Sequence, residues 1–238
     1  MNEPKLALRG RIQPGQYTVL LFALITLLFI YPVFATLASG QFILDVMFTA
    51  LLIIGAFATR RQMPRLFRQS VLVGVAGIAA NWLAYLVHSD IITLISYFLL
   101  AAFFAFEAAL ILVSVLRGSE VSLDKLQGAI CAYMLIGLMW GMLYCCVELV
   151  QPNSFHFVEG LQIENEVAAR GLPQFPSLIY LSFVTLTTLG FGDVTPVTPF
   201  SRMLCLMEAI CGQFYLAIFV ARLVGLHLAK EIVQQIDE

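Results

Sequence analysis

Six apolar runs, each close to the length of a membrane-spanning helix, dominate this 238-residue chain. They cover residues 17–37, 42–58, 70–88, 91–116, 127–150 and 201–228. A helix needs about 20 predominantly apolar residues to cross the hydrocarbon core of a bilayer. Only 12% of the residues are charged, whereas a soluble domain has about 25%. The pattern predicts an all-α membrane protein with six transmembrane helices.

The basic residues favour one orientation of these six spans. If both termini are cytoplasmic, only Arg170 and Arg202, of 13 Lys and Arg residues, lie on the outer side. Because Lys and Arg accumulate in cytoplasmic loops, we expect a plasma or bacterial inner membrane protein with both termini in the cytoplasm. The net charge of −2 provides no basic face for nucleic acid, so membrane lipids are the expected surroundings.

A seventh apolar run, at residues 177–188, is too short to span a bilayer and leads into the stretch TLTTLGFGDVTP, residues 185–196. Pro176 suits the first position of a helix, where its missing N–H costs nothing. Irregular backbone at membrane depth is tolerated only where it is buried in protein or lines a watery cavity. We therefore expect a short re-entrant helix that starts at the outer face, followed by extended backbone that returns to that face.

Over residues 127–228 the chain resembles the tetrameric pore-loop potassium channels, whose selectivity filter reads TVGYG. The corresponding residues are Thr188, Leu189, Gly190, Phe191 and Gly192. The resemblance implies K⁺ binding at Thr188, Leu189, Gly190 and Phe191, a homotetramer as the working unit, and no cofactor other than K⁺ as the permeant ion.

Physical chemistry points to the same residues. A permeating K⁺ ion must exchange its water shell for closely spaced oxygens, which inward-facing backbone carbonyls provide. Directing successive carbonyls inward requires alternating right- and left-handed conformations, which glycine accepts readily; this explains Gly190 and Gly192. We expect Leu189 and Phe191 to point away from the axis and to pack against the short helix.

The resemblance also implies supporting roles for four other residues. A hydrogen bond from Tyr180 to Asp193 and a carboxylate at Glu148 that holds the backbone just past the filter would both stabilise the loop. Gly212 occupies the place of a hinge glycine in the inner helix.

Two further acids lie inside apolar runs, where carboxylates are costly and are candidates for function by default. Glu208 either sits behind the filter and tunes ion binding or is buried in its protonated form. Glu107 has no basic residue near it in its own span, and the sequence names no partner for it.

The predicted organisation has five parts: a cytoplasmic tail (1–16), a four-helix transmembrane domain (17–116), a cytoplasmic linker (117–126) with Ser122 as a helix N-cap, a pore domain (127–228) and a second tail (229–238). The four-helix domain resembles voltage-gated channels in helix count only. Voltage sensors carry a ladder of arginines in the fourth span, and residues 91–116 contain no basic residue. Voltage sensing is therefore not expected.

The main prediction is a potassium-selective channel that conducts passively. One alternative is a non-selective cation channel of the same fold, and another is a membrane sensor or a potassium transporter subunit. We find no nucleophile–base pair that would favour an enzyme. The sequence does not identify the gating stimulus, the inactivation behaviour or the role of the first four helices.

Overall fold

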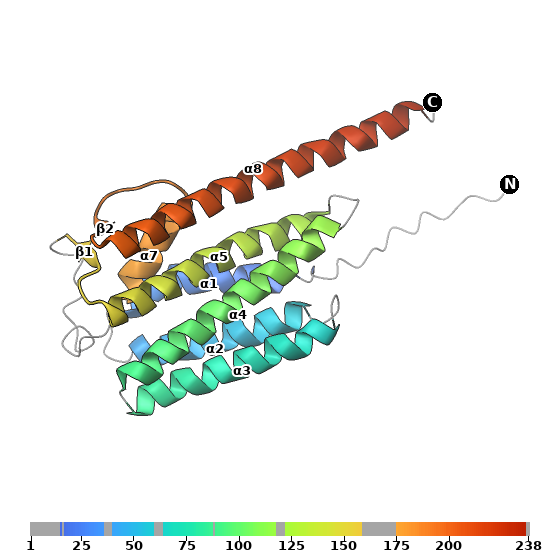
Figure 1. Cartoon of the computed structure of the whole chain (residues 1–238). Helices are drawn as coiled ribbons and strands as arrows, with labels where there is room; N and C mark the ends of the chain where they lie inside the picture. Colours follow the sequence, from blue (N-terminus) through green and yellow to red (C-terminus); the bar gives the residue numbers. More distant parts are fainter. Residues whose placement is uncertain are drawn as a thin grey trace.

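The computed structural model describes residues 15, 17–35, 40–59, 64–87, 89–117, 122–158 and 175–236. Most of these residues form helices, and the rest form two short strands and the turns and loops that connect the elements (Figure 1). The helices are α1 (Thr18–Ala35), α2 (Gly40–Thr59), α3 (Pro64–Val87), α4 (Asp90–Arg117), α5 (Leu123–Val150), α7 (Phe175–Leu186) and α8 (Pro199–Ile236). The strands are β1 (Phe155–Phe157) and β2 (Val194–Pro196).

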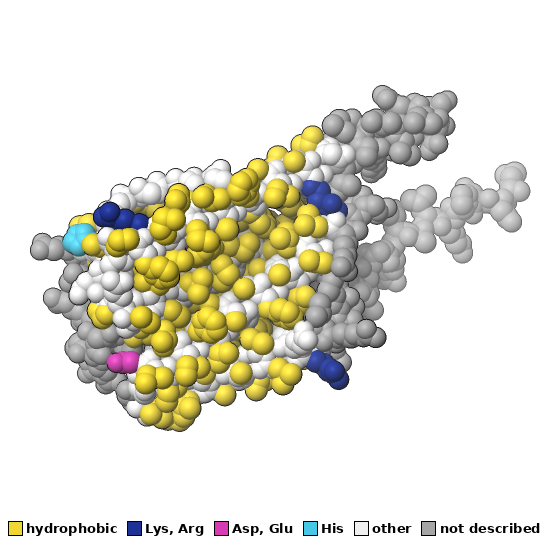
Figure 2. Space-filling model, in the orientation of Figure 1, with side chains coloured by type: hydrophobic (Ala, Val, Ile, Leu, Met, Phe, Trp, Pro, Cys, Tyr) yellow, Lys and Arg dark blue, Asp and Glu magenta, His cyan; other side chains and the backbone are white. Residues whose placement is uncertain are grey.

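The described helices suit a membrane environment. Three of them are long and apolar enough to cross a bilayer, at Asp90–Leu116, Leu123–Val150 and Pro199–Arg222. Shorter apolar helices lie at Thr18–Ile30, Val46–Phe57 and Phe175–Leu186. Figure 2 shows a face on which apolar side chains cover the middle and charged side chains lie at the two ends. The protein is therefore a helical membrane protein, while the six-span topology stays a prediction.

The four-helix region and the region that follows it share one core. The largest buried cluster contains side chains from both, including Leu24 of α1, Phe104 and Ile111 of α4, and Leu135 of α5. α4 lies antiparallel to α5 and packs along it (Figure 1). Because lipid tails are as apolar as leucine, helices in a membrane are held together by close packing and interhelical hydrogen bonds. A shared core therefore couples the two predicted domains mechanically.

The connection into α5 is fixed by polar contacts. Ser122 caps α5 by accepting a hydrogen bond from the Lys125 backbone N–H at 3.3 Å, as predicted. The backbone N–H of Tyr17 donates to Asp124 Oδ1 at 3.1 Å, and the Tyr17 hydroxyl donates to Ser114 Oγ at 3.2 Å. Tyr17 therefore ties the start of α1 to α4 and α5. Residues 118–121 of the predicted linker, most of the first predicted tail and residues 237–238 of the second lie outside the described residues. Residues 229–236 of the second predicted tail continue α8 as helix.

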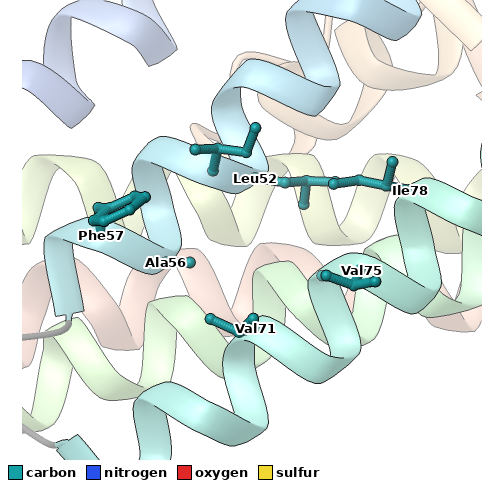
Figure 3. A pocket seen from close by; sticks show the side chains of 8 residues that line it. Leu52, Ala56, Phe57, Val71, Val75 and Ile78 are labelled. Carbon is teal, nitrogen blue, oxygen red and sulfur yellow. The ribbon is translucent and has the colours of Figure 1, made fainter.

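A pocket of about 240 Å³ lies between α2 and α3 (Figure 3). Its lining consists of Leu52, Ile53, Ala56, Phe57, Val71, Gly74, Val75 and Ile78. An ion that entered it would lose water without gaining a ligand, which is strongly unfavourable. The candidate ion site therefore has to be sought elsewhere.

Candidate functional site

The short helix α7 is held at its C-terminal end by hydrogen bonds. Its final turn tightens, because the Thr188 N–H donates to the Thr185 carbonyl at 2.9 Å. The Leu186 carbonyl accepts a hydrogen bond from the Tyr133 hydroxyl of α5 at 3.0 Å. Helix ends leave carbonyls without intrahelical partners, and the Tyr133 hydroxyl supplies a hydrogen-bond donor to one of these carbonyls. The chain then leaves the helix for the glycine-containing stretch.

Backbone conformation alternates along this stretch, which we call the loop segment, residues 187–193. Thr188, Gly190 and Gly192 have φ angles of 59°, 59° and 81°. The expected left-handed conformation is thus present at both glycines, and Thr188 adds a third position that was not foreseen. A Cβ atom added to Gly190 or Gly192 would meet nothing within 4 Å. Conformation, rather than crowding, is therefore the reason for glycine at these two positions.

The side chains between these positions are not covered by the chain. Leu189 is 60% exposed and Phe191 is 67% exposed. The expectation that they pack against the short helix is wrong for a single chain. The loop segment continues beyond the last turn of α7, so the helix offers these two side chains little surface. Any cover for them must come from outside the described residues.

The two ends of the loop segment are tied to the helices. The Tyr180 hydroxyl donates to Asp193 Oδ2 at 2.7 Å, which is the expected hydrogen bond. Asp193 Oδ1 also accepts from the backbone N–H of Val194 at 2.9 Å. At the other end, Gln213 Nε2 of α8 donates to Thr188 Oγ1 at 3.3 Å. Sequence reasoning missed Gln213, although an amide next to Gly212 in a mostly apolar helix was an available signal.

Glu148 holds a different piece of backbone from the one expected. Its Oε1 accepts from the Asn153 N–H at 2.8 Å and its Oε2 from the Phe155 N–H at 3.2 Å. These two N–H groups lie just before and at the start of β1, which precedes α7 in the chain, and not just past the loop segment. A carboxylate at the end of α5 is nearer in sequence to the chain that immediately follows it. Among the described residues, the strand pair is therefore what links Glu148 to the loop segment.

The strand pair connects the two sides of the outer region. β1 and β2 are antiparallel, with Phe155 opposite Pro196, His156 opposite Thr195 and Phe157 opposite Val194. The pairing continues where the Val158 N–H donates to the Asp193 carbonyl at 3.0 Å. The end of the loop segment is therefore fixed to the chain that follows α5. Residues 159–174, between β1 and α7, lie outside the described residues.

Gly212 has a packing role in this structure. α8 continues without interruption through Gly212. A Cβ atom at this position would lie 2.2 Å from the Leu186 carbonyl oxygen. Glycine therefore lets α8 approach the end of α7 closely, and the hinge role stays a prediction.

The two buried acids both have hydroxyl partners. Glu208 is fully buried where α5, α7 and α8 meet, and hydroxyls of Tyr144 and Ser182 hydrogen-bond to its carboxyl group. Glu107 is fully buried in the four-helix region, where the Ser70 hydroxyl of α3 donates to it. The structure therefore reveals hydrogen-bond partners for Glu208 and Glu107 that the sequence did not indicate.

A short helix and a glycine-containing loop between two long apolar helices are the features on which the sequence predicted an ion channel. Residues 134–226, from the middle of α5 into α8, match the family model described as ion channel. The chain belongs to the ion channel family.

Three curated proteins illustrate the similarity. Protein LctB of Geobacillus stearothermophilus is 32% identical over 111 residues, which are 47% of this chain and 78% of that protein. Protein LctB of Bacillus caldotenax is 29% identical over 105 residues, which are 44% of this chain and 74% of that protein. The "Putative potassium channel protein" of Rhodopseudomonas palustris is 31% identical over 77 residues, which are 32% of this chain and only 18% of that protein. No solved structure matches the chain significantly.

Proposed function

We propose that this ion channel protein conducts K⁺ selectively and passively through a homotetrameric pore. The pore would lie in a plasma or bacterial inner membrane, with both chain termini in the cytoplasm. The observation that carries the proposal is the left-handed backbone at Thr188, Gly190 and Gly192. Residues of positive φ alternate there with residues that do not have positive φ, directly after a short apolar helix.

This alternation suits the replacement of a hydration shell. In an ordinary extended strand successive carbonyls point in opposite directions, whereas alternating handedness turns them to one side. Carbonyls of residues 188–191, together with the Thr188 hydroxyl, would then act as ligands for dehydrated K⁺. The C-terminal end of α7 carries the negative end of a helix dipole and precedes these residues directly, which favours a cation.

The exposed surfaces of the single chain support a tetramer. One chain supplies one loop, and a ring of carbonyls around an axis requires several copies in closed symmetry. Leu189 and Phe191 are largely exposed apolar side chains beside the proposed ligands. Only 11% of the apolar window of α8 is buried in the chain. The potassium channel name of the Rhodopseudomonas relative favours K⁺ as the conducted ion.

The test is ion flux from the purified protein in liposomes under matched K⁺ and Na⁺ gradients. We expect K⁺ flux to exceed Na⁺ flux clearly in the parent protein. Gly190→Ala should remove selective flux, because a left-handed residue other than glycine costs about 1–2 kcal/mol in each subunit. Gly225→Ala is the matched control, since the added methyl group meets nothing within 4 Å and Gly225 lies in a helix.

Each other outcome contradicts part of the proposal. Equal K⁺ and Na⁺ flux through the parent would indicate a non-selective cation channel. Absence of flux would favour a membrane sensor or a transporter subunit. Unchanged selectivity in Gly190→Ala would show that the loop segment does not supply the ion ligands.

A further inference from the structure

Glu208 connects the three helices around the loop segment. It belongs to α8 and is completely buried. The Tyr144 hydroxyl of α5 donates to its Oε2 atom, and its Oε1 atom lies 2.5 Å from Ser182 Oγ of α7. Ser182 is completely buried as well. All three helices therefore meet through one carboxyl group.

The number of protons around Ser182 bears on the protonation state of this carboxyl group. Ser182 Oγ lies 2.6 Å from the Gly137 carbonyl oxygen of α5 and 2.5 Å from Glu208 Oε1. Both separations are hydrogen-bond distances. A serine hydroxyl has one proton to donate, and a carbonyl oxygen has none. If Ser182 donates to Gly137, the contact between Ser182 and Glu208 requires a proton on the glutamate.

We propose that Glu208 is a proton-binding positioning residue whose protonation holds α7 against α5 and α8 and thereby keeps the loop segment in its conducting conformation. In this state the Glu208 carboxyl donates to Ser182, Ser182 donates to the Gly137 carbonyl, and Tyr144 donates to the remaining carboxyl oxygen. Both carboxyl oxygens of Glu208 and the Ser182 hydroxyl then have hydrogen-bond partners, as buried polar groups require. This inference rests on the proposed channel function.

Loss of the proton disrupts the chain of hydrogen bonds. The Ser182 proton then turns toward the carboxylate, and Ser182 Oγ and the Gly137 oxygen are left facing each other at 2.6 Å without a proton between them. In addition, an ionised carboxylate in a buried site is costly unless it is paired. Both effects favour movement of α7 away from α5. Because α7 ends at Leu186 and the loop segment follows it, this movement changes the proposed ion ligands.

The described side chains that face Glu208 carry no positive charge that would neutralise an ionised carboxylate. From α5, Tyr144 contacts it directly, and Tyr133 interacts with it at longer range. From α8, Cys205 contacts the Tyr144 hydroxyl. From α7 its partner is Ser182, which does not titrate in the relevant pH range. No basic side chain among the described residues contributes to its interactions.

The main test measures K⁺ flux through the parent protein in liposomes at a series of pH values, with equal pH on both sides. We expect flux to fall by about threefold or more between about pH 6 and pH 9, because one hydrogen bond per subunit is lost and buried glutamates can titrate in this range. The sign follows from linkage, since a state that holds the extra proton becomes less favourable as the pH rises. Flux that does not change with pH would overturn the proposal.

Variants separate the proposed role from a general effect of pH. In Glu208→Gln the amide nitrogen can donate to Ser182 and the amide oxygen can accept from Tyr144, so flux should stay high and lose its pH dependence. Ser182→Ala should also lose the pH dependence, because the link from Glu208 to Gly137 is gone. Glu107→Gln is the matched control, since Glu107 is equally buried but lies in the four-helix region, and its pH profile should follow the parent. A parent-like profile in Glu208→Gln would overturn the proposal.

Infrared spectroscopy tests the protonation without relying on conduction. A protonated carboxyl band present in the parent at neutral pH should be missing from Glu208→Gln and retained in Ser182→Ala. If the parent does not conduct K⁺ at any pH but shows this band, the channel function fails while the protonation of Glu208 holds. Absence of a band assignable to Glu208 would overturn the proposal even if the channel conducts.

Discussion

Tyr180 and Asp193 join the middle of α7 to the far end of the loop segment, 13 residues later in the chain. The same carboxylate accepts from the Val194 backbone N–H, so one side chain fixes the point where the loop meets β2. A hydrogen bond to a charged group contributes about 1.5–3 kcal/mol, and exposure to solvent lowers this value. The Tyr180–Asp193 pair is exposed, and we therefore expect a modest effect on the loop.

Tyr180→Phe should shorten the time for which the pore stays conductive. Removing the hydroxyl loses one hydrogen bond worth about 1 kcal/mol, which corresponds to about a fivefold change in the equilibrium between conductive and non-conductive loops. Asp193→Asn should act similarly. An asparagine side chain has only one acceptor oxygen, whereas the Tyr180 hydroxyl and the Val194 N–H each donate to a separate oxygen of Asp193. The measurement is the decay of K⁺ current in sustained bilayer recordings.

The double variant is the control for this prediction. If the two residues act through one hydrogen bond, the combined change should be no larger than that of the stronger single variant. Additive effects of the two substitutions would show that the bond between them does not stabilise the conductive loop.

The residue-level predictions from the sequence succeeded where local chemistry decides the outcome. Left-handed backbone at Gly190 and Gly192 follows from the conformational freedom of glycine, and the Tyr180–Asp193 bond follows from their spacing in the resembled family. The left-handed φ of Thr188 was not predictable, because β-branched residues rarely adopt it. The contact from Gln213 also depends on how closely α8 approaches α7, which only the packed structure reveals.

At the scale of elements, the helices lie close to the apolar runs that predicted them. α4, for example, covers residues 90–117 where the sequence predicted a helix at 91–116, because apolar length is a strong local signal. The strand pair was missed because β1 and β2 have three residues each, too few for alternation to stand out. Its pairing also joins two segments that lie on either side of α7 in the chain, which no local pattern encodes.

The sequence of α4 leads to a prediction about voltage. One elementary charge that crosses the full membrane field gains about 2.3 kcal/mol per 100 mV, and α4 has no basic residue before Arg117. We expect open probability to depend only weakly on voltage, and Arg117→Gln should leave that dependence unchanged because Arg117 is the last residue of the helix. Steady-state bilayer currents over a range of voltages provide the measurement. A gating charge of several elementary charges per assembly would contradict the prediction.

At the scale of the whole molecule, the distribution of buried and exposed apolar surface is uneven. Half of the apolar window of α4 and 61% of that of α5 are buried within the chain, compared with 11% for α8. Figure 1 shows α8 along one side of the bundle, with its C-terminal part extending past the other helices. α8 therefore has little cover within the chain, and the loop segment next to it carries the exposed side chains of Leu189 and Phe191. A subunit of a larger assembly would present an apolar surface of this kind.

We therefore expect the purified protein in mild detergent to have four times the chain mass of 26.4 kDa by light scattering with detergent correction. Phe191→Ser should make this assembly dissociate at a lower temperature, because loss of a buried phenylalanine side chain costs about 3–5 kcal/mol and four copies would lose it together. Phe22→Ser is the matched control: Phe22 of α1 is 66% exposed in the single chain, compared with 67% for Phe191, and we expect lipid or detergent to cover it in either state. A monomeric parent would contradict the tetramer. If both serine variants dissociate at the same temperature as the parent, Phe191 does not pack against a neighbouring subunit.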